Sequence, residues 1–236
     1  MTQQLGILYG VSVGTGDPEL MTVKGLKLLQ NTSIIAFPAG INDQIGVAEK
    51  IIQPWLTTKQ KKLPLNFPYI LDEILLEKAW QVAAEIIWPY LEKGENVVFA
   101  CEGDVSFYST FTYLAETLKK QHPDAQIIRI PGVCSPMAAS ASLGIPLTIR
   151  QQKLVVLPAL YNVEELEKVL DWAEVIVLMK VSSVYETVWE ILQKRDLLKS
   201  AWIVEKATTN DEKIYRDLEN YPDLKFSYFS ILIIQV

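Results

Sequence analysis

The amino-acid sequence predicts an α/β protein made of two lobes. Short apolar runs typical of buried strands alternate with helix-patterned segments along the chain. This alternation breaks in the charged, proline-containing stretch 119–125, which has no apolar periodicity and is the best candidate linker. We therefore expect an amino-terminal lobe over residues 1–122 and a carboxyl-terminal lobe over residues 126–236. Alternating strands and helices favour largely parallel sheets.

The first half contains the strongest periodic signals. Asp17 is a good helix cap and Pro18 a good first helical residue, while Pro89 should kink or end its helix early. The predicted elements are a strand at 5–13, a helix at 19–30, a strand at 33–37, helices at 43–53 and 72–93, a strand at 96–100 and a helix at 107–120.

The second half repeats the pattern with shorter elements. Its first strand ends in Pro131-Gly132, and a helix rich in small residues follows. The predicted strands lie at 126–130, 154–157, 175–179, 202–205 and 226–236, and the predicted helices at 136–143, 163–172 and 183–194.

Composition limits the classes of function. The 236 residues carry a net charge of −6, so no nucleic-acid footprint is expected. The apolar runs 33–38 and 229–236 are too short to cross a bilayer, and the first residues lack the basic region of a secretory signal. The two cysteines, Cys101 and Cys134, have no metal-binding spacing, so we expect free thiols, no protein-bound metal and a cytoplasmic location.

The only histidine, His122, lies at the end of a helix-patterned segment. A cation at a helix carboxyl end is favoured by the helix dipole, so the position is explained without catalysis. Because no second histidine is present, Ser-His-Asp and histidine-metal mechanisms lose most of their support.

The first glycine turn, Gly14 to Pro18, follows the first predicted strand. It does not fit a dinucleotide fingerprint, because Glu19 stands where the third glycine would be. The capping Asp17 would also occupy the helix amino terminus that an anion needs. A capped strand-to-helix turn and a ligand-binding loop both remain open for this segment.

The second glycine turn carries two carboxylates. Glu102 and Asp104 flank Gly103 directly after a buried strand, where a carboxylate is costly unless it bonds amides, water or a ligand. Asp104 could be a plain cap for the following helix. Alternatively, the pair forms the floor of a site for a cationic cofactor, or supplies a group that removes a proton.

Further candidate residues also follow predicted strands: the segment 131–135, Met179 with Lys180, and the segment 207–210. Each signal is weak by itself. Open α/β sheets, however, bind ligands at the carboxyl ends of their strands, so the shared position is informative.

Taken together, these segments resemble the tetrapyrrole (corrin/porphyrin) methyltransferases, in the order and spacing of that family and over almost the whole chain. Val105 replaces the proline of most relatives and points to the branch that methylates precorrin-2 or cobalt-precorrin-2 at C-20. The segments that carry the resemblance are Val11-Ser-Val-Gly-Thr-Gly-Asp-Pro-Glu-Leu-Met-Thr22, Glu102-Gly-Asp-Val-Ser-Phe-Tyr-Ser-Thr110, Pro131-Gly-Val-Cys-Ser135, Leu178-Met-Lys180 and Glu205-Lys-Ala-Thr208.

The resemblance implies S-adenosylmethionine as methyl donor, S-adenosylhomocysteine as product, a site in the cleft between two α/β lobes, and a homodimer. It implies methyl transfer to the C-20 meso carbon of precorrin-2 or cobalt-precorrin-2 in cobalamin biosynthesis, with any cobalt held by the substrate. The first loop, Thr15, Gly16 and Asp17, would face the tetrapyrrole. The implied cofactor contacts are Glu102, Gly103, Asp104, Phe107, Cys134, Ser135, Met179, Ala207 and Thr208.

The chain departs from the family pattern at three further positions. Ser12 and Thr15 stand where many relatives have glycine and proline, and Cys134 stands where serine or threonine is commoner. These departures weaken the residue roles in the first loop and at Cys134, and leave cofactor binding expected.

Methylation of a meso carbon requires loss of the proton on that carbon. Asp104 is the expected acceptor, with Glu102 or a water as alternatives. A substrate with eight carboxylates also needs local cations. Lys180 is the substrate-binding candidate, and the other lysines and arginines near motif ends are Lys24, Arg150, Lys153 and Lys206.

Other functions remain open. A methylase of the same fold could act on a different tetrapyrrole carbon, or on an RNA or diphthamide-type acceptor, although no basic surface or extra recognition segment is evident. The failed fingerprint disfavours an NAD-dependent reductase. A non-catalytic binding lobe is the last alternative.

Overall fold

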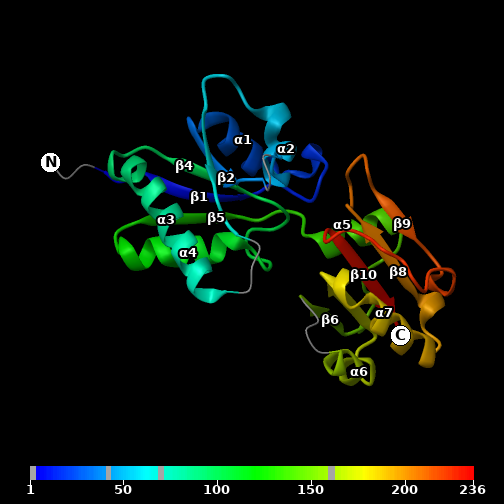
Figure 1. Ribbon diagram of the computed structural model, residues 1–236. Coiled ribbons are helices and arrows are strands. Elements are labelled where there is room, and N and C mark those ends of the chain that lie inside the picture. The colour runs from blue at the N-terminus through cyan, green and yellow to red at the C-terminus, as the bar shows by residue number, and fades with distance from the viewer. Residues whose placement is uncertain (1–3, 41–43, 69–71, 159–162) are drawn as a thin grey trace. The chain divides into compact units, whose positions relative to one another are not determined.

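A computed structural model describes residues 4–40, 44–68, 72–158 and 163–236. The chain divides into two compact units, residues 1–134 and 135–236, each with its own sheet and core (Figure 1). The two-lobe α/β prediction is confirmed. The strand at 126–130, which we expected to open the second lobe, pairs instead with the first strand of the first sheet. The units therefore divide after the following loop, at Cys134 and Ser135.

The first sheet has five strands, and all of its pairings are parallel. Its spatial order is β3-β2-β4-β1-β5. The strands are β1 (Ile7–Ser12), β2 (Ile34–Pro38), β3 (Lys61–Leu65), β4 (Val97–Cys101) and β5 (Gln126–Ile130).

Helices cover both faces of this sheet. Figure 1 shows α1 (Val23–Asn31) and α2 (Val47–Ile52) on one side, and α3 (Glu73–Glu92) and α4 (Thr110–Gln121) on the other. Apolar strand residues of alternating parity point into two separate cores, as the period of two requires. On the α4 side, Gly10 of β1 lies so close to the Phe111 ring that a Cβ would stand 2.4 Å from it.

Three predicted helix boundaries need correction. Asp17 caps only a 3-10 turn, Pro18–Leu20, and α1 starts later, where the Thr22 hydroxyl accepts a hydrogen bond from the amide of Gly25. Ser109, not Asp104, caps α4. Pro89 does not end α3, which continues for three residues beyond it to Glu92.

The second sheet is mixed, so the expectation of largely parallel sheets is wrong for this unit. Its order is β6-β7-β10-β8-β9, and the last strand of the chain inserts antiparallel between β7 and β8. The strands are β6 (Leu154–Leu157), β7 (Val175–Met179), β8 (Ala201–Glu205), β9 (Lys213–Tyr215) and β10 (Ser230–Gln235).

One face of this sheet packs against α6 (Glu164–Leu170) and α7 (Tyr185–Lys194). The helix α5 (Ser135–Leu143) packs against β8 and β10 and buries Ala138 and Ala139, which explains its small residues. Short 3-10 turns complete the fold at Gln53–Trp55, Val181–Ser183, Leu198–Ser200 and Leu218–Asn220.

Two strands have no counterpart in the prediction. β3 carries two lysines and Pro64, and β9 has only three residues, so neither shows an apolar run. Both are edge strands, where polar residues and proline are tolerated. The predicted helix at 43–53 lies partly outside the described residues, within which α2 begins at Val47.

The single histidine has the predicted position. His122 is the C-cap residue of α4, where its backbone amide donates to Leu118. Its ring stacks on Trp88 with centroids 3.8 Å apart, and its Nε2 atom lies 3.4 Å from the Glu85 carboxylate.

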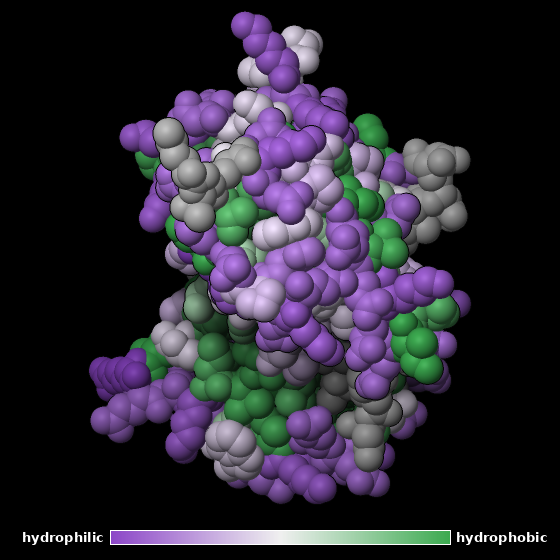
Figure 2. All heavy atoms as spheres, turned by 90° about the vertical axis from the view of Figure 1, so that its left-hand side faces the viewer, coloured by the Kyte–Doolittle hydropathy of each residue, from purple (hydrophilic) through white to green (hydrophobic). Residues whose placement is uncertain are grey.

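Hydrophilic side chains dominate the face of the molecule in Figure 2, where apolar side chains gather in patches. Of the helices in the described ranges, none combines the length and the apolar character that a membrane span requires.

Candidate functional site

The first sheet reverses its strand order between β1 and β4. The chain leaves β1 for β2 on one side and leaves β4 for β5 on the other side. Open α/β sheets bind ligands outside the carboxyl ends of the strands at such a switch point. Both acidic glycine turns follow these two strands, so the fold brings the first loop and the second turn to this position.

Backbone hydrogen bonds join the two turns directly. The amide of Gly103 donates to the carbonyl of Gly14 at 2.7 Å, and the amide of Val13 donates to the carbonyl of Cys101 at 2.9 Å. Thr15, Gly16 and Asp17, all partly buried, continue from this junction. The Asp17 carboxylate accepts from the amide of Glu19 at 2.8 Å. The capped-turn interpretation of the first loop is therefore correct, and it leaves the ligand-binding interpretation open.

Asp104 ties the second turn to the loop after β5. Its Oδ2 atom accepts a hydrogen bond from the amide of Gly132 at 2.8 Å, and its Oδ1 atom accepts one from the amide of Ser106 at 2.8 Å. Both carboxylate oxygens are thus engaged by backbone donors. The side chain joins two loops, and its hydrogen bonds offset the cost of its partly buried charge.

Ser12 completes this junction from the end of β1. Its fully buried hydroxyl donates to the carbonyl of Ile130 at 2.8 Å and accepts from the amide of Val105 at 2.8 Å. Ser12 and Val105 are two of the positions at which the chain departs from the family pattern described above. Valine has an amide proton that proline lacks, and serine has a hydroxyl that glycine lacks. The two departures therefore form one hydrogen bond, which neither glycine nor proline could make.

Glu102 differs from Asp104 although only Gly103 separates them. Among the described residues, no hydrogen-bond or ion-pair partner of its carboxylate is found. Burial raises the pKa of Glu102 to about 7, because the charged form loses hydration that nothing replaces. A carboxyl group with this pKa exchanges its proton near neutrality, as general acids and bases do.

The space beside Gly103 is open. Gly103 has a φ of +68°, and a Cβ placed on it would meet no atom within 4 Å. A ligand can therefore approach this backbone closely. Phe107, partly buried, lies in the same turn with its ring 4.8 Å from that of Tyr108. Cys134 ends the unit, two residues after the Gly132 amide that binds Asp104, and is a free thiol.

The remaining candidate residues belong to the second unit. β7 and β8 run in the same direction on either side of β10, so their carboxyl ends lie at one edge of the sheet. Met179 pairs with Ile231 there, and the neighbouring Glu205 pairs with Ser230. Lys180 follows Met179, and its ammonium lies 5.5 Å from the centre of the Tyr228 ring.

This edge holds several strained residues. Lys180, Lys206 and Thr208 adopt the left-handed conformation with φ values of 55°, 49° and 67°. Non-glycine residues in this conformation are uncommon and cluster at functional sites. Ala207, buried between two of them, is a predicted cofactor contact. Ser135 begins α5 in the same unit.

The structure thus forms two groups from the predicted residues. Ser12 and the loop-joining role of Asp104 were not foreseen, because a hydrogen bond between residues 93 positions apart leaves no local sequence signal. The members in the first unit are Thr15, Gly16, Asp17, Glu102, Gly103, Asp104, Phe107 and Cys134, and those in the second are Ser135, Met179, Lys180, Ala207 and Thr208.

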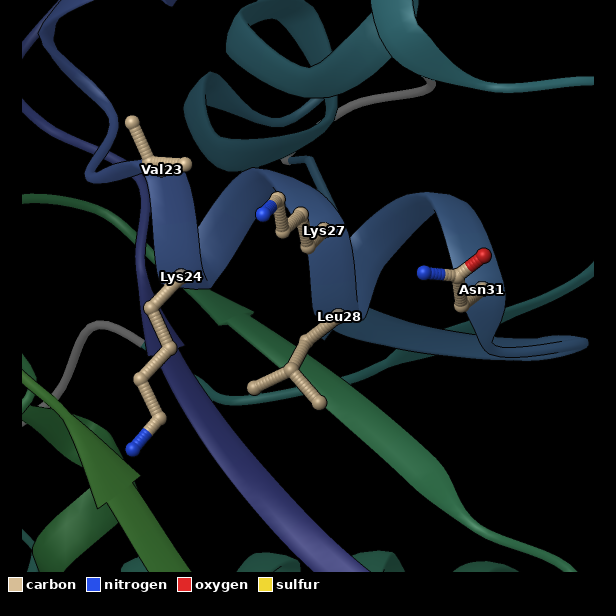
Figure 3. Close-up of a pocket in the computed structure, with 5 residues that line it drawn as sticks. All are labelled: Val23, Lys24, Lys27, Leu28 and Asn31. Atoms are coloured by element: carbon tan, nitrogen blue, oxygen red, sulfur yellow. The ribbon is translucent and has the colours of Figure 1, made fainter.

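A separate hollow runs along the exposed side of α1. Figure 3 shows the side chains that line it, those of Val23, Lys24, Lys27, Leu28 and Asn31. None of them is a predicted cofactor contact. Lys24 lies in the first turn of α1, soon after the first loop, and so at the carboxyl edge of the sheet.

Comparison with known proteins agrees with this geometry. Residues 7–220 match the family model of the Tetrapyrrole (Corrin/Porphyrin) Methylases, and the chain belongs to this family. It is 32% identical to the probable cobalt-precorrin-2 C(20)-methyltransferase of Methanocaldococcus jannaschii, covering 97% of this chain and 95% of that protein.

Two further similarities are informative. The cobalamin biosynthesis protein CobIJ of Mycobacterium bovis is 31% identical over 97% of this chain, which spans only 46% of that longer relative. The structure of uroporphyrin-III C-methyl transferase from Thermus thermophilus, complexed with S-adenosyl homocysteine, superposes with a TM-score of 0.65 at 16% identity. The superposition covers 98% of this chain and 97% of the Thermus thermophilus chain. At 16% identity, the similarity supports the fold alone.

We predict that Ser12 and Val105 are energetically coupled. Ser12→Ala leaves the buried amide of Val105 without an acceptor, which should lower the free energy of unfolding by about 2 kcal/mol. Val105→Pro removes that amide proton, so it should cost about 1 kcal/mol less in the Ser12→Ala background than in the wild type. Urea unfolding of the four proteins measures the coupling. Strictly additive costs would contradict the pairing.

Proposed function

We propose that this protein transfers a methyl group from S-adenosylmethionine to the C-20 meso carbon of precorrin-2 or cobalt-precorrin-2, in cobalamin biosynthesis. The observation that carries the proposal is the turn at the switch point of the first sheet. There the carboxyl group of Glu102, which has no partner among the described residues, stands beside the open backbone of Gly103. Family membership and the names of relatives that match nearly end to end support the same reaction.

The residues fit this donor. A sulfonium and an α-ammonium group are cationic, so an acidic turn attracts them whereas it would repel a pyrophosphate. The open space at Gly103 is a cradle that any side chain would fill. When bound, S-adenosylmethionine supplies an electrophilic methyl group. The residues proposed to hold it are Glu102, Gly103, Asp104, Phe107, Cys134, Ser135, Met179, Ala207 and Thr208.

We assign the proton transfer to Glu102 in preference to Asp104. Methylation leaves a proton on the meso carbon that must depart for conjugation to be restored. Asp104 already accepts two backbone hydrogen bonds, and releasing them would loosen its own turn and the loop after β5. Among the described residues, Glu102 holds no loop through its carboxylate. Its pKa of about 7 suits a group that accepts a proton and returns it to water.

The substrate would lie against the first loop, Thr15, Gly16 and Asp17, with Lys180 opposing its carboxylates. Lys180 is exposed. It directly follows β7, whose last residue, Met179, is a proposed cofactor contact. Positioning of donor and acceptor in line supplies much of the rate in such a displacement.

Three properties extend the proposal. The family resemblance implies a homodimer, which a mass measurement in solution tests. The two free cysteines fit a reduced cytoplasmic location. Any cobalt would enter within the substrate macrocycle, with no metal held by the protein itself.

Two measurements test the function. Calorimetric titration should show binding of S-adenosylhomocysteine, and incubation with labelled donor and each macrocycle should place the new methyl at C-20 by NMR. Methylation at another carbon would overturn the C-20 assignment within the family. Absence of binding to both donor and product would overturn the methyltransferase proposal.

Glu102→Gln should lower kcat by about 10²-fold or more and, because Glu102 is also a proposed contact of the donor, should weaken the affinity for S-adenosylhomocysteine by a smaller factor. A base must be ionised, so the wild-type kcat should rise with pH through about 7. Glu116→Gln, an exposed glutamate on α4, is the matched control and should change neither quantity. A Glu102→Gln enzyme with the wild-type pH profile would remove Glu102 from the chemistry.

Lys180→Glu should raise the KM for the tetrapyrrole about tenfold, because it replaces attraction to a carboxylate with repulsion. The KM for S-adenosylmethionine should change less. Lys168→Glu, on the exposed side of α6, makes the same change in net charge and should leave both values unchanged. Equal effects of the two substitutions would exclude Lys180 from the substrate site.

A further inference from the structure

The loop after β8 has a backbone that needs outside support. Lys206 and Thr208 both adopt the left-handed conformation, on either side of the buried Ala207. Side chains with a Cβ disfavour this conformation, so it persists only where surrounding contacts fix it. One such contact is local, since the amide of Lys206 donates to the carbonyl of Phe229 at 2.7 Å.

A further support comes from Glu212. Its Oε2 atom accepts a hydrogen bond from the amide of Thr208 at 2.6 Å and another from the Ser142 hydroxyl at 2.6 Å. Hydrogen bonds to a carboxylate are short and stronger than those between neutral groups. A single oxygen thus fixes the left-handed Thr208 and attaches its loop to α5.

One of these two attachments coincides with proposed cofactor contacts, whereas the other, at Ser142, lies in the last turn of α5. Ala207 and Thr208 lie in the loop, and Ser135 begins the helix that carries Ser142. All of these residues belong to the second unit, so the link does not depend on the first. If the carboxylate were lost, Thr208 could relax to an ordinary conformation and its loop could move away from α5.

The geometry points to Glu212 as a positioning residue for the methyl donor: it holds the Ala207–Thr208 backbone in its binding arrangement, against the last turn of α5, without touching the ligand. This inference rests on the proposed function, because it takes these segments as contacts of S-adenosylmethionine. No motif marks Glu212, which lies four residues beyond Thr208 in a polar stretch.

The test measures the affinity for S-adenosylhomocysteine by calorimetry in four variants. Glu212→Ala should weaken binding at least tenfold, and Ser142→Ala, which removes only the helix contact, should weaken it about threefold. Glu212→Gln should recover most of the loss, because its amide oxygen keeps two lone pairs for the same donors. Asp211→Ala is the matched control, since this exposed neighbour makes only a 3.7 Å ion pair with Lys206, and its affinity should stay within twofold of wild type.

A second readout separates positioning from general stability. The short hydrogen bond should place the Thr208 amide proton at low field in the NMR spectrum, and Glu212→Ala should move it upfield. The KM for S-adenosylmethionine should rise more than kcat falls. If Glu212→Ala does not fold, Ser142→Ala and Glu212→Gln carry the same comparison.

The outcomes are distinct. If the wild-type protein binds S-adenosylhomocysteine and both Glu212→Ala and Ser142→Ala bind it with the same affinity, the positioning role is overturned and the proposed function stands. A wild-type protein that binds neither the donor nor its product would overturn the proposed function and this inference with it.

Discussion

The arrangement of the first unit depends on hydrogen bonds that join three loops at one edge of a parallel sheet. Ser12 closes β1 onto Val105 and Ile130, and Asp104 closes the second turn onto Gly132. The strands are held by their own ladders, and these hydrogen bonds connect the loops that follow them. Rigid loops at a switch point are what a ligand site in an open α/β sheet requires. The buried hydroxyl of Ser12 and the amide of Val105 therefore act together in holding these loops.

The two carboxylates of the second turn illustrate how environment assigns roles. Asp104 is satisfied by backbone amides and acts as part of the scaffold. Glu102 lacks such donors, and burial raises its pKa to about 7. Two carboxyl groups of one turn thus have different surroundings, one bound by backbone amides and one with its pKa raised by burial, and a glycine with open space beside it separates them. This division is a stronger argument for a cationic ligand than the mere count of acidic residues.

The sequence alone was sufficient for the parts of the structure that local patterns encode. Alternating elements predicted the two α/β units, and glycine turns after strands predicted which residues gather at the carboxyl edges. Strand β3 was missed because its lysines and Pro64 interrupt the apolar pattern of a buried strand. The antiparallel insertion of β10 was missed because strand pairing is non-local. The domain boundary was placed too early for the same reason, since β5 joins β1 across more than a hundred residues.

Site chemistry showed the same limit. The motif residues lie where they were expected, but the use of each side chain depends on partners far away in the sequence. Asp104, the expected proton acceptor, also binds the amides of Ser106 and Gly132, which no local pattern indicates. Glu212 supports the second sheet edge through Ser142, seventy positions earlier. Such partnerships become visible only when the backbone has brought the residues together.

One measurement tests most directly the proposal that Gly103 in the first unit and Thr208 in the second contact the methyl donor. Titration of ¹⁵N-labelled protein with S-adenosylhomocysteine should shift the amide resonances of Gly103 and Thr208 together, with one affinity. Shifts confined to other surfaces, such as the exposed side of α1, would contradict the account.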